Sequence, residues 1–308
     1  MASAAEHRER VRAAMTAAGV DLLVLGREAN VRYVSGANRL WLAGTRPFAP
    51  SCVLVGATGA LHLLSITDDG VPSDIPRERL YPISWNSANL IAAVAAAAAG
   101  TAVRRVGVDG MSPLFALLLG GAFPDAELVD GEALLRAVRR VKSDEDVAAI
   151  RDAVAVTESA LAAVRDAARP GVDACTLAGV FEERMGALGV TTPAFDPDIT
   201  VDGARVSARV GVLREGWEGT LARTWPDGGP ARDTVRGALD ALKPGVAVTD
   251  MTARGVTLEG VGLGHEALRA DEVLAGGMVV LVGAARGGAR WAEPVWLRDR
   301  GYERLARG

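Results

Sequence analysis

The sequence predicts a two-domain α+β protein. Through the first 140 residues, short apolar runs bounded by Gly, Pro or Asn alternate with helical stretches, which is typical of a small α/β layer structure. A second region opens with a long helix and continues, from Val206 onward, as strands joined by glycine turns with one helix at 230–242. The 308 residues suffice for two hydrophobic cores. We therefore expect domains at 1–140 and 141–308.

The elements of the first domain follow from its apolar runs. An amphipathic helix is expected at 7–19, closed by Gly19. Short runs of apolar residues then predict five strands, at 21–26, 31–36, 52–56, 61–66 and 106–109. High alanine and leucine content predicts two helices, at 88–99 and near 112–120.

The second domain begins with a helix that has a clear start and stop. Ser143 is a suitable N-cap, and acidic residues follow it in the first turn, where the helix dipole favours them. Apolar residues at helical spacing continue as far as Arg169-Pro170-Gly171, which ends the helix. A second helix is expected at 174–188.

Composition excludes several classes of function. A net charge of −4 argues against a general nucleic-acid binder. The longest apolar run, 88–99, is too short to span a bilayer, and the charged start resembles no secretory signal. Cys52 and Cys175 match neither a disulfide framework nor a metal-ligand spacing. We expect a cytoplasmic protein without nucleic-acid or membrane partners.

Several short motifs occur along most of the chain. They are Asn30 to Gly36, Lys142 to Ile150, Gly216 to Thr224, Gly260 to Glu266 and Gly301 to Leu305. In this order and spacing they resemble the creatinase, prolidase and aminopeptidase P family. The resemblance implies a creatinase-like N-terminal domain, a pita-bread domain and a homodimer. The second domain is short for the family, and the missing residues are expected between Ile199 and Val212.

The resemblance also bears on metal binding. Active members of the family hold two divalent cations through two Asp, one His and two Glu, a ligand set with a charge of about −4. The matching positions here are Arg209, Thr220, Glu259, Gly283 and Glu293, with a net charge of −1. Two carboxylates cannot fix two cations, and a guanidinium repels them. We predict a degenerate metal site and no cofactor; a single weakly held ion on Glu259 and Glu293 is the alternative.

Loss of the metals would leave Glu259 and Glu293 as neighbouring like charges, which is costly. We therefore hypothesise that Arg209 occupies the vacated space and neutralises both by bidentate hydrogen bonds.

Catalytic roles are expected for His265, Glu293 and Glu259. His265 resembles the family histidine that shuttles protons or holds the substrate. Carboxylates in such a cavity suit acid/base chemistry, whereas the alternative for the two glutamates is a buried structural role. The other histidines, His7 and His62, are expected to be solvated and structural, respectively.

Substrate contacts are expected from Arg209, Arg223, Arg205, Thr220, Arg39 and Trp41. Arginine forks bind carboxylates, although a solvated loop and sheet packing are the alternatives for these arginines. Arg39 and Trp41 follow the N-terminal motif, in a region that can reach the neighbouring subunit's cavity in family dimers.

Together these features predict a metal-independent hydrolase or lyase. It would use acid/base chemistry on a small carboxylate- or amide-bearing molecule, by hydrolysis, elimination or cyclisation, in a biosynthetic role. Creatinase shows, at the level of the family, that this fold cleaves a C–N bond without metal. The alternatives are a non-catalytic dimer that binds a ligand or partner, and a residual Xaa-Pro aminopeptidase.

Overall fold

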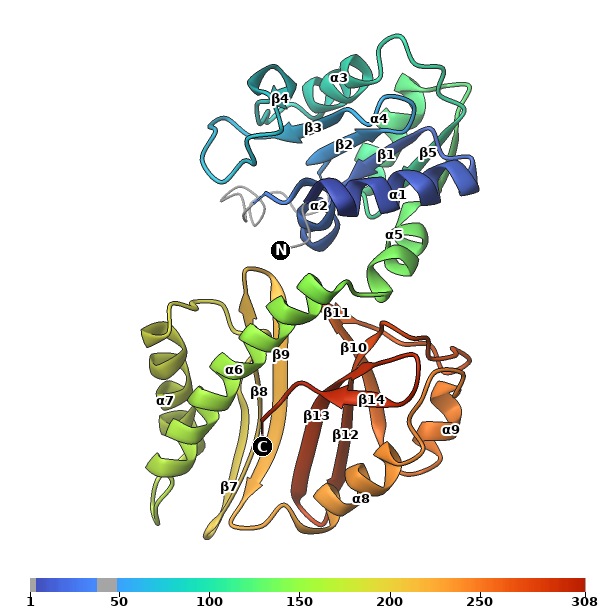
Figure 1. Cartoon of the computed structure of the whole chain (residues 1–308). Helices are drawn as coiled ribbons and strands as arrows, with labels where there is room; N and C mark the ends of the chain where they lie inside the picture. The colour runs from blue at the N-terminus through green and yellow to red at the C-terminus, as the bar shows by residue number, and fades with distance from the viewer. Residues whose placement is uncertain (1–3, 38–48, 308) are drawn as a thin grey trace. The chain divides into compact units, whose positions relative to one another are not determined.

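A computed structural model describes residues 4–37 and 49–307 (Figure 1). The chain divides between Arg139 and Arg140 into two compact units, and each unit has a sheet of its own. Arg39 and Trp41 lie outside the described residues, so their predicted substrate contacts stay predictions. Within the described ranges, no helix has the length and hydrophobicity needed to cross a membrane.

The N-terminal unit contains a six-stranded mixed sheet in the order β4-β3-β2-β1-β5-β6. Its strands are β1 (Leu22–Leu25), β2 (Cys52–Val55), β3 (Leu61–Leu64), β4 (Leu80–Tyr81), β5 (Arg105–Val108) and β6 (Glu127–Asp130). Its helices are α1 (Ala4–Ala18), α2 (Glu28–Ser35), α3 (Ser87–Ala97), α4 (Pro113–Ala122) and α5 (Gly131–Arg140). The central strands β1 and β2 are buried throughout, because their apolar residues face helices or neighbouring strands on both sides.

One predicted strand of this unit is wrong. Residues 31–36 belong to helix α2 and the glycine that ends it, not to a strand. Gly36, at φ 71°, supplies the left-handed conformation that closes the helix. At the other end, the buried carboxylate of Asp109 accepts hydrogen bonds from the backbone N–H groups of Gly26 and Arg27 and from the amide of Asn30. Tertiary hydrogen bonds to the segment that leads into α2 and to Asn30 thus override the β-favouring composition of Val31 to Val34.

The second unit contains an eight-stranded sheet. Its main path runs in the order β11-β10-β12-β13-β9-β8-β7, and β14 pairs with β13. The strands are β7 (Asp198–Asp202), β8 (Arg205–Arg214), β9 (Trp217–Trp225), β10 (Thr257–Gly262), β11 (Gly264–Glu266), β12 (Val279–Arg286), β13 (Ala289–Leu297) and β14 (Tyr302–Arg304). The segment expected to be shortened forms a hairpin, in which β7 and β8 turn at Gly203.

Two pairs of helices cover different parts of this sheet (Figure 1). Helices α6 (Asp144–Ala167) and α7 (Ala174–Ala187) pack against β8 and β9 around Phe181 and Val210. Helices α8 (Gly229–Leu239) and α9 (Val248–Thr252) pack against β12 and β13 around Val235 and Val282. Helix α6 begins with the predicted Ser143 cap, which forms a complete capping box with Asp146.

Candidate functional site

Strand pairing places four of the five positions matched to family metal ligands, namely Arg209, Thr220, Glu259 and Gly283, on one face of the second sheet. Directly paired residues of antiparallel strands have their side chains on the same face, and successive residues alternate between faces. One row of pairs crosses the sheet through Arg209, Ala222, Ala292, Gly283 and Thr257. Glu259 is two residues from Thr257 and therefore shares this face. Thr220, two residues from Ala222, shares it as well. We call this surface the Arg209 face.

The Arg209 face is concave. Strands β8 and β10 are separated by β9, β13 and β12, so their backbones would be roughly 19 Å apart in a flat sheet with 4.8 Å strand spacing. Nevertheless, Nη2 of Arg209 lies 2.7 Å from Oε2 of Glu259. Two extended side chains and one hydrogen bond reach only about 15 Å. The sheet must therefore curve around this face, and the bridge between Trp217 and Leu263 joins its two halves at one end.

Arg209 lies on this concave face, on β8. Its guanidinium donates a hydrogen bond to Glu259 and stacks on the ring of Phe195, 4.6 Å from the ring centroid. The side chains of Arg209 and Glu259 are 33% and 29% exposed, so a small solute can reach both. A guanidinium has five N–H donors, and one of them is engaged with Glu259 in the described part of the chain. The remaining donors suit an anionic group.

A second polar pair lies on the same face. The hydroxyl of Thr220 donates a hydrogen bond of 2.6 Å to Oε1 of Glu218, and both residues are buried. The two residues are two positions apart along β9, so both side chains lie on the Arg209 face. Gly211, opposite Thr220, leaves room for this pair, because a Cβ at that position would lie 2.4 Å from the Thr220 hydroxyl.

Glu293 does not belong to this face, and its predicted position beside Glu259 is wrong. It pairs with Val282 and alternates with Ala292, so its side chain lies on the opposite, helix-covered face. There, Oε1 accepts a hydrogen bond of 2.7 Å from the indole of Trp291, and Oε2 lies 3.4 Å from the guanidinium of Arg304. Arg209 thus pairs with Glu259 alone, through a single hydrogen bond rather than the predicted bidentate pair, and the hypothesis is wrong for Glu293.

The structure also removes Arg223 from the substrate contacts. Arg223 is buried on the helix-covered face, where it donates hydrogen bonds to the carbonyls of Ala222 and Ala292 and stacks on Trp291 at 4.1 Å. Burial lowers the pKa of its guanidinium, whereas the charge of Glu293 raises it. Its role is therefore packing, the alternative given above.

The remaining predicted residues are less closely connected to Arg209. Arg205 is exposed and donates to the carbonyl of Gly287, in the turn between β12 and β13. The backbone of His265 pairs with Val261, two residues along β10 from Glu259. The side chain of His265 is not among the parts of the chain that the structure describes. Its predicted catalytic role stays a prediction.

Two residues of the Arg209 face escaped the sequence analysis. Glu218 could have been found, because it precedes Thr220 by two positions on a strand and must share its face. Phe195 had no comparable signal. It lies in an irregular segment between the isolated Pro193–Val212 bridge and the start of β7, so its position depends on the pairing of β8.

The residues of the Arg209 face do not fit a pair of divalent cations. Thr220 already bonds to Glu218, Gly283 and Ala292 offer no side-chain donor, and Arg209 brings a positive charge against Glu259. Among the described residues, no three His, Cys, Asp or Glu side chains gather closely enough to hold a metal ion. We therefore derive no chemical step through a metal.

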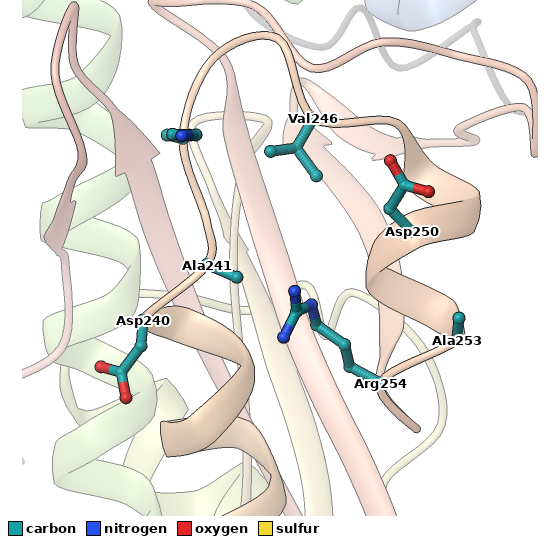
Figure 2. A pocket seen from close by; sticks show the side chains of 7 residues that line it. Asp240, Ala241, Val246, Asp250, Ala253 and Arg254 are labelled. Carbon is teal, nitrogen blue, oxygen red and sulfur yellow. The ribbon is translucent and has the colours of Figure 1, made fainter.

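A separate groove lies near helices α8 and α9 (Figure 2). It has a volume of about 510 Å³ and is lined by residues between Asp240 and Arg254. Figure 2 shows Asp240 and Asp250 on its rim and Arg254 reaching in between them. Since no lining residue comes from β8 or β10, the groove is distinct from the Arg209 face.

Comparison with known proteins identifies the N-terminal unit. Residues 7–141 match the Creatinase/Prolidase N-terminal domain. No curated protein sequence matches the chain.

Solved structures resemble both units. The prolidase of Pyrococcus horikoshii has a TM-score of 0.78 at 17% identity, covering 98% of each chain. An X-Pro aminopeptidase from Thermotoga maritima has a TM-score of 0.78 at 17% identity, covering 98% of this chain and 97% of that one. Dipeptidase PepE of Mycobacterium ulcerans has a TM-score of 0.77 at 22% identity, covering 100% and 96%. At such identities these likenesses establish the fold, an α+β chain that ends in a pita-bread domain. The N-terminal unit thus matches the Creatinase/Prolidase N-terminal domain, and the whole chain has the fold of prolidases and aminopeptidases P.

Proposed function

We propose that the protein is a metal-independent enzyme that acts by acid/base chemistry on a small molecule bearing a carboxylate or amide. The observation that carries this proposal is the part-exposed Arg209–Glu259 pair on the concave face. It combines a cation that can anchor an anion with a carboxylate that can accept a proton. Hydrolysis, elimination and cyclisation all need such a pair of groups.

In this proposal Arg209 binds the carboxylate of the substrate through its free N–H donors, while Phe195 holds the guanidinium plane in place. Glu259 accepts the proton, and its hydrogen bond to Arg209 holds its carboxylate in position. His265 is proposed as the second proton carrier. Its backbone in β11 pairs with Val261, which is two residues from Glu259 along β10. Glu293 has no part in it, because its carboxylate lies on the other face.

The test is turnover by protein treated with a chelator. Candidate substrates are N-acyl amino acids, small amides and Xaa-Pro dipeptides. Replacing Glu259 by Gln should lower kcat by about 10²- to 10⁴-fold, the usual contribution of a general base. Arg209→Met should mainly raise KM, and Arg209→Lys should recover part of the affinity. Glu293→Gln is the matched control and should leave kcat unchanged. Turnover that disappears with chelation and returns with manganese would contradict the proposal.

A second candidate function is binding without catalysis. It is favoured by the mutual satisfaction of the polar groups, since Glu259 is held by Arg209 and Glu218 by Thr220. Calorimetry with the same small carboxylates would then show binding that Arg209→Met weakens and Glu259→Gln does not. A residual Xaa-Pro aminopeptidase is the third candidate, and it requires turnover of Xaa-Pro peptides with added manganese or cobalt.

We further propose that the protein is a homodimer. Large apolar side chains are exposed on the N-terminal unit, including Trp85 (84%), Leu117 (74%) and Leu114 (53%). Large apolar side chains this exposed are candidates for burial in an interface between two copies of the chain. Light scattering on the purified chain gives its mass directly, and a monomer at micromolar concentration would reject this proposal.

A further inference from the structure

Sequence matching assigned Glu293 to the fifth metal-ligand position of the family. The strand pairing assigns that position to a different residue. Arg209, Thr220, Glu259 and Gly283 all lie on the concave face, as metal ligands of one site must. In β13 the residue on that face is Ala292, which pairs with both Ala222 and Gly283. Ala292 is therefore the fifth position, and Glu293 is its neighbour on the other face.

This correction changes the charge of the site. With Ala292 in place of a glutamate, the five positions keep one carboxylate, that of Glu259, and gain one guanidinium, that of Arg209. Their net charge is zero, whereas two divalent cations require a strongly negative ligand set. Glu218, on the same face, is not at one of the five positions; its carboxylate is buried and accepts a hydrogen bond from the Thr220 hydroxyl.

The same ion pair has a mechanical consequence. It connects β8 to β10 across the three strands that lie between them in the sheet. A metal bridged by ligands from those strands would hold the curved sheet in the same way. Here one salt bridge makes that connection without any ion.

We propose that Arg209 takes the place of the two cations. Its guanidinium neutralises Glu259 and connects β8 to β10 by a salt bridge. The Arg209 face therefore excludes divalent metals and keeps its shape without them. This inference rests on strand register and charge, and it holds whether the protein is an enzyme or a binder.

The first test uses the whole protein. After dialysis against manganese, cobalt or zinc, elemental analysis should find no stoichiometric metal, and none of these ions should raise the melting temperature. Stoichiometric metal in the unmodified chain would overturn the proposal.

The salt bridge between β8 and β10 is tested by a double-mutant cycle of Arg209→Met and Glu259→Gln. It should show a coupling of roughly two- to five-fold in the unfolding constant, as for a part-exposed pair. A coupling factor of one would show that this salt bridge does not stabilise the fold.

The second test introduces metal ligands on the Arg209 face and asks whether residue 292 or residue 293 is the fifth ligand position. The variant Arg209→Asp/Thr220→Asp keeps the native Glu293, and adding Ala292→Glu supplies a carboxylate on the concave face. The triple variant should bind manganese at least about ten-fold more tightly than the double variant, since affinity follows the number of charged ligands. Glu293→Gln in the triple variant should leave that affinity unchanged. Loss of binding with Glu293→Gln, or equal affinity of the double and triple variants, would refute the register assignment. Gly283 is left untouched, because a Cβ there would lie 2.9 Å from the Thr257 hydroxyl.

Discussion

The buried ion pair between Lys142 and Glu266 allows a sharp prediction about stability. Nζ of Lys142 lies 2.8 Å from Oε2 of Glu266, and the two side chains are 1% and 2% exposed. The pair joins the segment before α6 to β11, at the edge of the second sheet. Gly262 makes room for it, because a Cβ there would lie 2.2 Å from Oε1 of Glu266.

Replacing Lys142 by Met should cost about 3–5 kcal/mol in the free energy of unfolding, because a buried carboxylate loses its partner. The loss should approach the upper end, since Oε1 of Glu266 is buried without a hydrogen-bond partner in the described part of the chain. The double variant Lys142→Met/Glu266→Leu should recover much of the loss, because both charges are then removed.

Urea unfolding followed by fluorescence measures these differences, and equal m-values would show that the same transition is compared. The matched control is Arg151→Met, which removes the part-exposed pair of Arg151 with Glu303 in the same unit. That change should cost no more than about 1 kcal/mol. If Lys142→Met cost as little as the control, or if the double variant were no more stable than the single one, the reasoning about burial would fail.

Three further predictions concern single residues. Burial raises the pKa of Asp109 from 3.8 to about 6, so the folded state favours its protonated form and this contribution to stability is lost as the pH rises through about 4 to 6. Between about pH 4 and pH 7 the wild type should therefore lose about 2 kcal/mol relative to Asp109→Asn, and parallel pH profiles of urea stability would contradict this. Gly219→Ala should destabilise by more than about 3 kcal/mol, because the new Cβ would meet the backbone of Ala153 in α6 at 2.3 Å; a melting temperature like that of the wild type would show that α6 can move. Burial raises the pKa of Cys52 far above its usual range, while Cys175 is exposed, so a thiol reagent should label Cys175 at once and Cys52 only after unfolding.

The sequence was most informative where local chemistry decides the structure. The Ser143 cap, the glycine that ends α1 and the apolar periodicity of α6 depend on neighbours within a few residues, and the structure has all three. Helix α2 was mistaken for a strand because Asp109, which holds the segment before the helix and the Asn30 side chain, lies far along the chain. The short helix α5 was missed altogether.

The candidate site shows a second limit. Glu293 was matched to a family glutamate by residue type, but a ligand must also lie on the right face of its strand. From Ala292 to Leu297 nearly every residue is apolar and buried, so the alternation that normally reveals the two faces is absent from the sequence. Only the pairing of Ala292 with Ala222 and Gly283 fixes the phase.

If the Arg209 face stands in place of a metal site, as proposed above, its residues balance charge in two ways. Carboxylates grouped to hold cations repel one another once the cations are gone, so a chain that merely lost its metals would be destabilised. Here Thr220, Gly283 and Ala292 remove charge, and Arg209 supplies a partner for the one carboxylate that remains. Substitution at one position alone would leave an unbalanced site, whereas the combination leaves a neutral one. The retained Glu259 therefore has a partner, is reachable from solvent and is oriented, which are the properties that acid/base chemistry or anion binding requires.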